Sequence, residues 1–206
     1  MDRQAKLREL ETLRERVARL EAELAAEGPS PWPPRQYYTA YHATTGFMLG
    51  MLAALASLLL NVFGALLVGR HPLELIRVYL TFPLGERALD YQMGNDWLVL
   101  TMGVCLYIGT GALYGIVFQL ALTWFTPHSS MGARLALVSV LGLAIWVINF
   151  YGILAWLQPL LFGGNWIVER VPIVVAAGTH LVFGWTMLLV SPLGRFTPYS
   201  PETQSA

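Results

Sequence analysis

The sequence predicts an all-α integral membrane protein with four transmembrane helices. Of its 206 residues, 55% are hydrophobic and only 13% are charged, whereas soluble domains carry about 25% charged residues. Four stretches also lack charged side chains over a length that suffices to cross a bilayer, for which a helix needs about 20 apolar residues. Thirteen Lys and Arg residues balance thirteen Asp and Glu residues. We therefore expect no basic surface for nucleic acid, and no nucleic-acid partner.

The first expected element is an amphipathic, coiled-coil-like helix over residues 1–27. Its apolar side chains recur at alternating steps of three and four residues, which is the spacing of a coiled-coil seam. The residues of this seam are Leu10, Leu13, Val17, Leu20 and Leu24. Glu9 with Arg14, and Arg16 with Glu21, occupy flanking positions as pairs of opposite charge, as a parallel self-pairing or a matched partner would require. A single helix docked on a partner subunit is the alternative, and both interpretations imply a protein partner.

Residues 28–44 are expected to form a Pro/Tyr-rich linker. The stretch GPSPWPPR (28–35) contains four prolines, which favour extended polyproline geometry and make a stiff spacer. The stretch QYYTAYH (36–42) follows with three tyrosines. Aromatic clusters next to a span are typical of the membrane interface, so we expect these tyrosines to anchor the first span.

The membrane domain is expected over residues 45–192, followed by a C-terminal tail at 193–206. The four spans are predicted at about 46–69, 97–125, 135–158 and 171–191. The third uncharged run is longer than one span needs, and we expect it to end near Pro159, which cannot continue the hydrogen-bond ladder.

An interfacial amphipathic helix is expected over about 72–90, between the first two spans. On a helix, Leu73, Ile76 and Leu80 share one face. Glu74, Arg77 and Thr81 share another. Such a separation of apolar and polar faces is typical of helices that lie flat in the headgroup region.

An even number of spans places both termini on the same side of the membrane. The N-terminus has no apolar segment of the kind found in cleaved signal peptides, so the first span would act as the insertion signal. Since nothing exports the charged N-terminal segment, we expect cytoplasmic termini in a bacterial inner membrane.

Similar short motifs occur in both halves of the membrane domain. NVFG (61–64) in the first span resembles NFYG (149–152) in the third, and GTGALYG (109–115) in the second resembles GTHLVFG (178–184) in the fourth. This pattern favours two tandem two-helix repeats related by an axis along the membrane normal. Chance is the alternative, because glycine, threonine and aromatic residues are common in membrane helices.

Small residues predict where the helices pack. Helices in lipid approach closely where glycine, alanine and serine form a continuous face. The glycines expected at such contacts are Gly46, Gly50, Gly111, Gly115 and Gly184. We expect other membrane-protein subunits to bind through the N-terminal helix and these small-residue helix faces, and lipids to surround the spans.

Few polar residues lie at membrane depth, and none of the four predicted spans contains Asp, Glu, Lys or Arg. This argues against a proton pump or an ion-coupled carrier, which need ionisable groups there. We expect Asn61 and Asn149 to form interhelical hydrogen bonds. The sequence contains no Walker-type loop, GxSxG motif or metal-ligand pair, so no catalytic residue and no metal site are predicted.

His180 is the candidate cofactor-binding residue, because a histidine in mid-span is a functional-site hypothesis by default. Quinone, haem or chlorophyll are the cofactors that it could bind. Haem with two histidine ligands is disfavoured, because His42, His71 and His128 lie at span ends or in loops. The alternative is an interhelical hydrogen bond from His180 to Asn61 or Asn149, and on balance no cofactor is predicted.

These features lead to three functional hypotheses. The first is a non-catalytic accessory subunit of a multi-subunit bacterial inner-membrane complex, such as a respiratory or photosynthetic electron-transport assembly. The second is a small homo-oligomeric channel or carrier for a neutral solute, lined by Asn61, Asn149 and His180. The third is a quinone- or pigment-binding redox subunit that uses His180.

Overall fold

The structure, a computed structural model, describes residues 3–26, 35–67, 69–91, 96–127 and 129–195, and helices joined by short turns account for most of them. No strand occurs in these ranges. Four helices are long and apolar enough to cross a membrane. The predicted all-α fold with four candidate spans is therefore confirmed, and it indicates a multi-pass membrane protein.

The chain divides into two units, Met1–Tyr38 and Thr39–Ala206. Within the first unit, α1 (Arg3–Ala26) is a single uninterrupted helix. The apolar seam of this helix is exposed, with 45% to 56% of Leu10, Leu13, Val17 and Leu20 accessible. The side chain of Leu24 lies outside the described part of the structure. The predicted helix is thus present, and its pairing with a partner stays a prediction.

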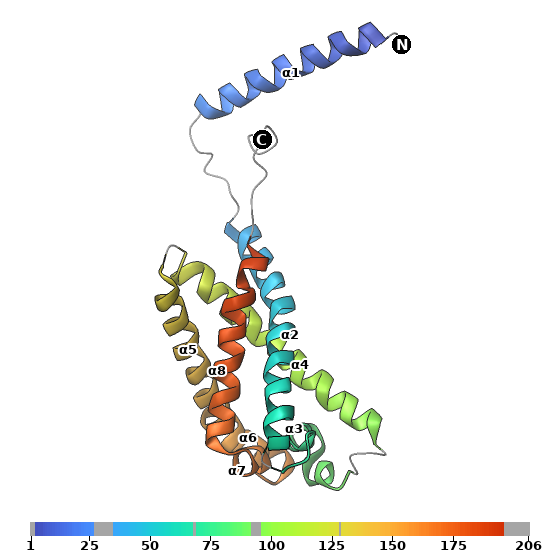
Figure 1. The fold of residues 1–206 in the computed structure, drawn as a ribbon, viewed down its shortest axis with the longest axis vertical. Helices are drawn as coiled ribbons and strands as arrows, with labels where there is room; N and C mark the ends of the chain where they lie inside the picture. Colours follow the sequence, from blue (N-terminus) through green and yellow to red (C-terminus); the bar gives the residue numbers. More distant parts are fainter. Residues whose placement is uncertain (1–2, 27–34, 68, 92–95, 128, 196–206) are drawn as a thin grey trace. The chain divides into compact units, whose positions relative to one another are not determined.

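The second unit contains the spans (Figure 1). The first, second and fourth are formed by α2 (Arg35–Leu67), α4 (Trp97–Phe125) and α8 (Ile173–Val190), the last extended by the 3-10 turn η3 (Ser191–Gly194). The third is composite: α5 (Met131–Val147), a π-helical segment η2 (Ile148–Leu154) and α6 (Ala155–Phe162). The second span has the predicted bounds.

The other element boundaries differ from the prediction, most at the start of the first span and at both ends of the third. Helix α2 begins at Arg35, so residues 35–44, expected in the linker, are its first turns; no proline or glycine follows Pro34 there to prevent helix formation. The third span runs from Met131 to Phe162 and passes through Pro159. Gly163 ends it instead, because its left-handed backbone (φ +84°) lets its N–H donate to the Pro159 carbonyl at 2.9 Å, as in many glycine-terminated helices.

Helices α2 and α4 cross with their backbones in contact at four predicted glycines. A Cβ added to Gly50 would lie 2.5 Å from the Gly111 carbonyl oxygen, and one on Gly46 would lie 2.7 Å from that of Gly115. Gly184 of α8 has the same role against α5, where a Cβ would lie 2.8 Å from the Val138 carbonyl oxygen. No residue larger than glycine fits at these positions without moving a backbone.

Helices α3 (Glu74–Leu84), η1 (Gly85–Leu89), α6 and α7 (Trp166–Arg170) gather at one end of this unit (Figure 1). Ile76 and Leu80 of α3 pack over Gly103 of α4, as their shared apolar face predicts. Thr81, expected on the polar face, is fully buried, and so is nearly all of Val78. The segment is therefore packed against protein on more than one side, and its position in the headgroup region stays a prediction.

A fully buried glutamine explains why Thr81 is tolerated inside. Gln158 Nε2 donates to Thr81 Oγ1 at 2.9 Å, and the Ile167 backbone N–H donates to Gln158 Oε1 at 3.1 Å. Thr81 in turn donates to the Val78 carbonyl of its own helix. Gln158 thus joins α6 to α3 and α7 and satisfies buried polar groups from both.

We expect Gly115→Ala to lower the free energy of unfolding by about 1–3 kcal/mol, because its methyl group would overlap the backbone of Gly46 and Gly50 and overpacking carries a cost of that size. Gly109→Ala on the same helix is the matched control. It meets no atom within 4 Å and should leave stability unchanged or raise it by up to about 1 kcal/mol. Unfolding in detergent measures both, and equal losses would contradict the proposed contact.

We expect Gln158→Leu to destabilise the protein by about 1–3 kcal/mol, because it leaves the Ile167 N–H buried without an acceptor. Gln119→Leu is the control. Gln119 is equally buried but makes one long hydrogen bond, Nε2 to the Ser191 carbonyl at 3.4 Å, and its Oε1 has no partner. Chemical unfolding in micelles should show the smaller loss for Gln119→Leu, and the reverse order would contradict the role of Gln158.

Candidate functional site

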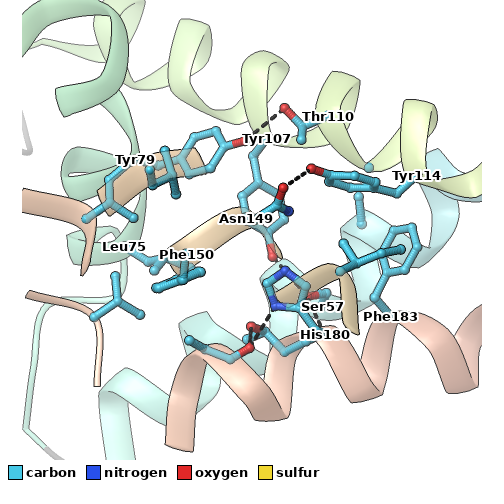
Figure 2. Close-up of a pocket in the computed structure, with 18 of the residues that line it drawn as sticks. Ser57, Leu75, Tyr79, Tyr107, Thr110, Tyr114, Asn149, Phe150, His180 and Phe183 are labelled. Atoms are coloured by element: carbon cyan, nitrogen blue, oxygen red, sulfur yellow. Dashed lines mark hydrogen bonds between the residues drawn. The ribbon is translucent and has the colours of Figure 1, made fainter. Parts of the chain in front are cut away.

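A cavity of about 320 Å³ lies within the second unit, between the spans and α3 (Figure 2). Residues of α2, α3, α4, α5, η2, α7 and α8 line it. Among the described residues that line it, none is Asp, Glu, Lys or Arg. The volume is near the lower end of the range for small-molecule sites, about 300–1,000 Å³. An engineered apolar cavity of about 150 Å³ in another protein binds benzene, so this one has room for a substituted ring.

Helix α4 supplies one wall with a polar stripe. Tyr107, Thr110 and Tyr114 recur at steps of three and four residues, which brings them to one face of the helix. Gly111 lies on the same face and packs against α2. The glycine contact between α2 and α4 therefore fixes the depth and direction of this stripe.

The three tyrosines of the cavity all donate their hydroxyl protons to protein acceptors. Tyr79 of α3 donates to Thr110 Oγ1 at 2.8 Å, and Thr110 donates to the Leu106 carbonyl. Tyr114 donates to Asn149 Oδ1 at 2.7 Å. Tyr107 and Ser57 lie 2.9 Å apart, and because Ser57 gives its own proton to the Thr179 carbonyl, Tyr107 is the donor. Each series of hydrogen bonds ends on a carbonyl or amide oxygen, which can only accept.

His180 of α8 lies on the side of the cavity opposite α4 (Figure 2). Its Nδ1 is 2.8 Å from the Ala176 carbonyl oxygen, one turn earlier. A carbonyl oxygen only accepts, so Nδ1 carries the proton, and Nε2 of the neutral ring is an acceptor. Among the described residues, Nε2 has no hydrogen-bond partner, and it remains accessible. Phe150 meets the ring edge to face, with centroids 6.2 Å apart.

The expected hydrogen bond from His180 to an asparagine is not formed. A side chain on a helix leans toward the N-terminus of that helix, which brings the His180 ring to its own Ala176 carbonyl. Asn149 instead joins η2 to α4 through Tyr114. Asn61 Nδ2 donates to the Ser57 carbonyl at 2.9 Å, within α2, and the Asn61 side chain also hydrogen-bonds Tyr107 of α4, as expected of an interhelical contact. Asn61 does not line the cavity.

The structure thus brings together two of the three polar residues that the sequence singled out. Asn149 and His180 share the cavity, and Asn61 lies outside it. Sequence reasoning missed the tyrosines, although the spacing of Tyr107 and Tyr114 in α4 was a usable signal. Tyr79 had no such signal, because its place depends on how α3 packs against the spans.

The cavity constrains which cofactor could bind. His180 is the only histidine among the described residues that line it, so a tetrapyrrole would have one protein ligand, and the space suits a single substituted ring better than a macrocycle. In the described parts of the chain, no group of three or more His, Cys, Asp or Glu side chains is placed to hold a metal ion.

Comparisons of the chain with protein-family models, with curated proteins and with solved structures found no match. The cavity and the exposed seam of α1 are therefore the features that bear on function. Both follow from the residues and contacts described above, and neither depends on a related protein.

Of the three tyrosines that line the cavity, Tyr79 belongs to α3 and so lies outside the candidate membrane spans. Burial raises its pKa from 10.0 to about 12, and its hydrogen bond to Thr110 opposes the shift. The unfolded chain therefore releases this proton first as the pH rises. The contribution of Tyr79 to stability is therefore complete below about pH 10 and is lost between pH 10 and about 12, by up to about 2–3 kcal/mol.

We expect Tyr79→Phe to flatten this alkaline loss of stability, because it removes the titrating group. The measurement is the free energy of unfolding in detergent across this pH range. Tyr151→Phe, at an exposed tyrosine, is the control and should retain the wild-type slope. A Tyr79→Phe profile parallel to that of the wild type would contradict the assignment.

Proposed function

We propose that this protein is a non-catalytic accessory subunit of a multi-subunit bacterial inner-membrane complex, such as a respiratory or photosynthetic electron-transport assembly. The observation that carries the proposal is the exposed apolar seam along α1. In this proposal the termini are cytoplasmic, and α1 binds another subunit on that side of the membrane.

A helix with this seam needs a partner for energetic reasons. Leu10, Leu13, Val17 and Leu20 are each about half exposed on α1. Most helical stability in proteins comes from packing of an apolar face, and isolated helices are marginal in water. Burial of these side chains would contribute about 25 cal/mol for each Å² removed from water.

The charges beside the seam indicate what the partner looks like. Glu9 and Arg16 flank one side of the seam, and Arg14 and Glu21 flank the other. A parallel helix with its own apolar seam and the opposite order of charges would pair with them. The partner proposed is a helix of another subunit. A second copy of this chain, whose Arg14 and Glu21 would also meet Glu9 and Arg16 with opposite charges, is the competing occupant.

The membrane unit offers faces for lipids and neighbouring subunits. The third span is the least buried of the four. It exposes large side chains such as Leu135, Val140 and Trp156, which suit acyl chains or other apolar helices.

Pairing of the spans supports the proposed internal duplication. In the first half, α2 and α4 contact each other at glycines, and in the second half α5 and α8 do so at Gly142 and Gly184. Gly115 and Gly184 close the two similar seven-residue motifs, and both are contact positions. Two units of the same orientation in tandem would be related by an axis along the membrane normal.

We expect Leu13→Glu with Leu20→Glu to release a stoichiometric partner subunit from the protein purified natively in mild detergent. Buried glutamates in the seam would lose their hydration without a counter-charge. Native mass spectrometry identifies the subunit and its stoichiometry. Thr12→Glu with Ala22→Glu is the matched control, since it adds the same charge at exposed positions away from the seam of α1 and should leave the complex intact.

Two results would overturn the proposal. A monomer without other subunits, from both the wild type and the control, would show that α1 holds no partner. A homodimer that the seam substitutions disperse would assign α1 to self-pairing instead.

A further inference from the structure

We propose that the cavity beside His180 binds a neutral, lipid-soluble aromatic hydroxyl compound of the phenol or hydroquinone class, and that it binds the hydroquinone more tightly than the corresponding quinone. This inference goes beyond the proposed subunit role and does not depend on α1. It follows from the hydrogen-bonding capacity that the protein leaves open inside the cavity.

The ligand must be neutral and mostly apolar. None of the described residues that line the cavity is charged at neutral pH as Asp, Glu, Lys or Arg would be, and an ion at membrane depth needs a partner of opposite charge. The cavity opens among transmembrane helices, so a ligand that partitions into lipid can reach it.

Aromatic walls favour an aromatic ligand. Phe150 stands edge to face with His180, and Tyr79 does so with Tyr107 at a centroid distance of 5.4 Å. Phe183 forms a similar pair with Phe118 at 5.3 Å. A substituted benzene ring continues such edge-to-face packing, which contributes about 0.5–1.5 kcal/mol for each pair beyond the buried area in measured cases.

Among the groups that line the cavity, several hydrogen-bond acceptors but few donors remain available to a ligand. Tyr79 and Tyr114 donate their hydroxyl protons to protein oxygens. Tyr107 does the same toward Ser57, because Ser57 donates its own proton to the Thr179 carbonyl at 3.2 Å. These oxygens can therefore offer only lone pairs to a ligand, and Tyr107, which also hydrogen-bonds Asn61, has the least capacity left. His180 Nε2 is a further open acceptor, because Nδ1 holds the proton against the Ala176 carbonyl.

Asn149 supplies the open donor. Its Oδ1 accepts from Tyr114, and its Nδ2 has no hydrogen bond to any described residue and is not enclosed. A ligand that only accepts, such as a quinone, could therefore use Asn149 alone, and it would place its second carbonyl oxygen among acceptors.

A hydroquinone satisfies this pattern better than a quinone. Its hydroxyl groups can donate to His180 Nε2 and to a tyrosine oxygen, and a hydroxyl oxygen can still accept from Asn149 Nδ2. For a quinone to bond His180, the histidine would have to change tautomer and give up its bond to Ala176. The cavity is thus complementary to the reduced form.

The test compares durohydroquinone with duroquinone, two tetramethylated rings that differ only by two hydrogen atoms. The full-length protein is placed in nanodiscs under anaerobic conditions and titrated calorimetrically, with empty nanodiscs as the blank for partitioning. We expect the hydroquinone to bind roughly tenfold more tightly, which corresponds to about 1.4 kcal/mol and is the size of one or two net hydrogen bonds.

Two variants at the same position distinguish the role of the ring nitrogen from a packing effect. His180→Leu removes the acceptor and should abolish the preference for the hydroquinone. His180→Gln keeps an acceptor oxygen and should retain part of it. His71→Leu makes the same exchange at an exposed histidine outside the cavity and should behave as the wild type.

The outcomes that overturn the proposal are distinct from those that concern the subunit role. Failure of both ligands to bind would show that the cavity takes another class of molecule. Tighter binding of duroquinone would show that the donor and acceptor assignment is wrong. A preference that survives in His180→Leu would remove His180 from the site, and none of these results bears on the partner of α1.

Discussion

Backbone contact between α2 and α4 is the constraint on which the rest of the membrane unit depends. Gly50 and Gly115 let the two helices touch without side chains between them, and close packing replaces the hydrophobic effect as the source of helix association in lipid. This contact sets the height at which α4 presents Tyr107 and Tyr114. Because Ser57 of α2 then accepts from Tyr107, the same crossing both packs the unit and fixes a hydroxyl of the cavity.

The hydrogen bonds of the tyrosines around the cavity share one direction: the tyrosine hydroxyl donates and a neighbouring side-chain oxygen accepts. An unpaired donor in hydrocarbon is costly, and here the tyrosine hydroxyls donate to Thr110, Ser57 and Asn149, which line the same cavity. The tyrosine oxygens consequently present lone pairs to the cavity, and Asn149 Nδ2 is the open donor beside them. Pairing these donors inside the protein therefore also gives the cavity its proposed preference for a ligand that donates hydrogen bonds.

The sequence predicts what depends on composition and local pattern, namely the four spans, the glycine contacts and the position of His180 in the fourth span. It fails where the outcome depends on tertiary packing. Thr81 fits a polar face by spacing, but Gln158, which is distant in sequence, makes its burial favourable. The π-helical segment Ile148–Leu154, which contains Asn149, has no simple sequence signal. Pro159 suggested an end to a helix that continues to Gly163.

The two similar motifs, GTGALYG and GTHLVFG, differ most at their third residue, and packing explains why only one holds a histidine. In the first motif this residue is Gly111, where an added Cβ would overlap the side chain of Ala54 in α2 and lie 3.2 Å from Phe183. In the second it is His180, whose backbone contacts Gly142 of α5 while its ring has the cavity in front of it. Because Gly142 has no side chain, the backbone of α8 packs closely against α5 at this point, and the His180 side chain can face the cavity. A histidine at residue 111 would separate α2 from α4, and a glycine at residue 180 would leave the cavity without its strongest acceptor.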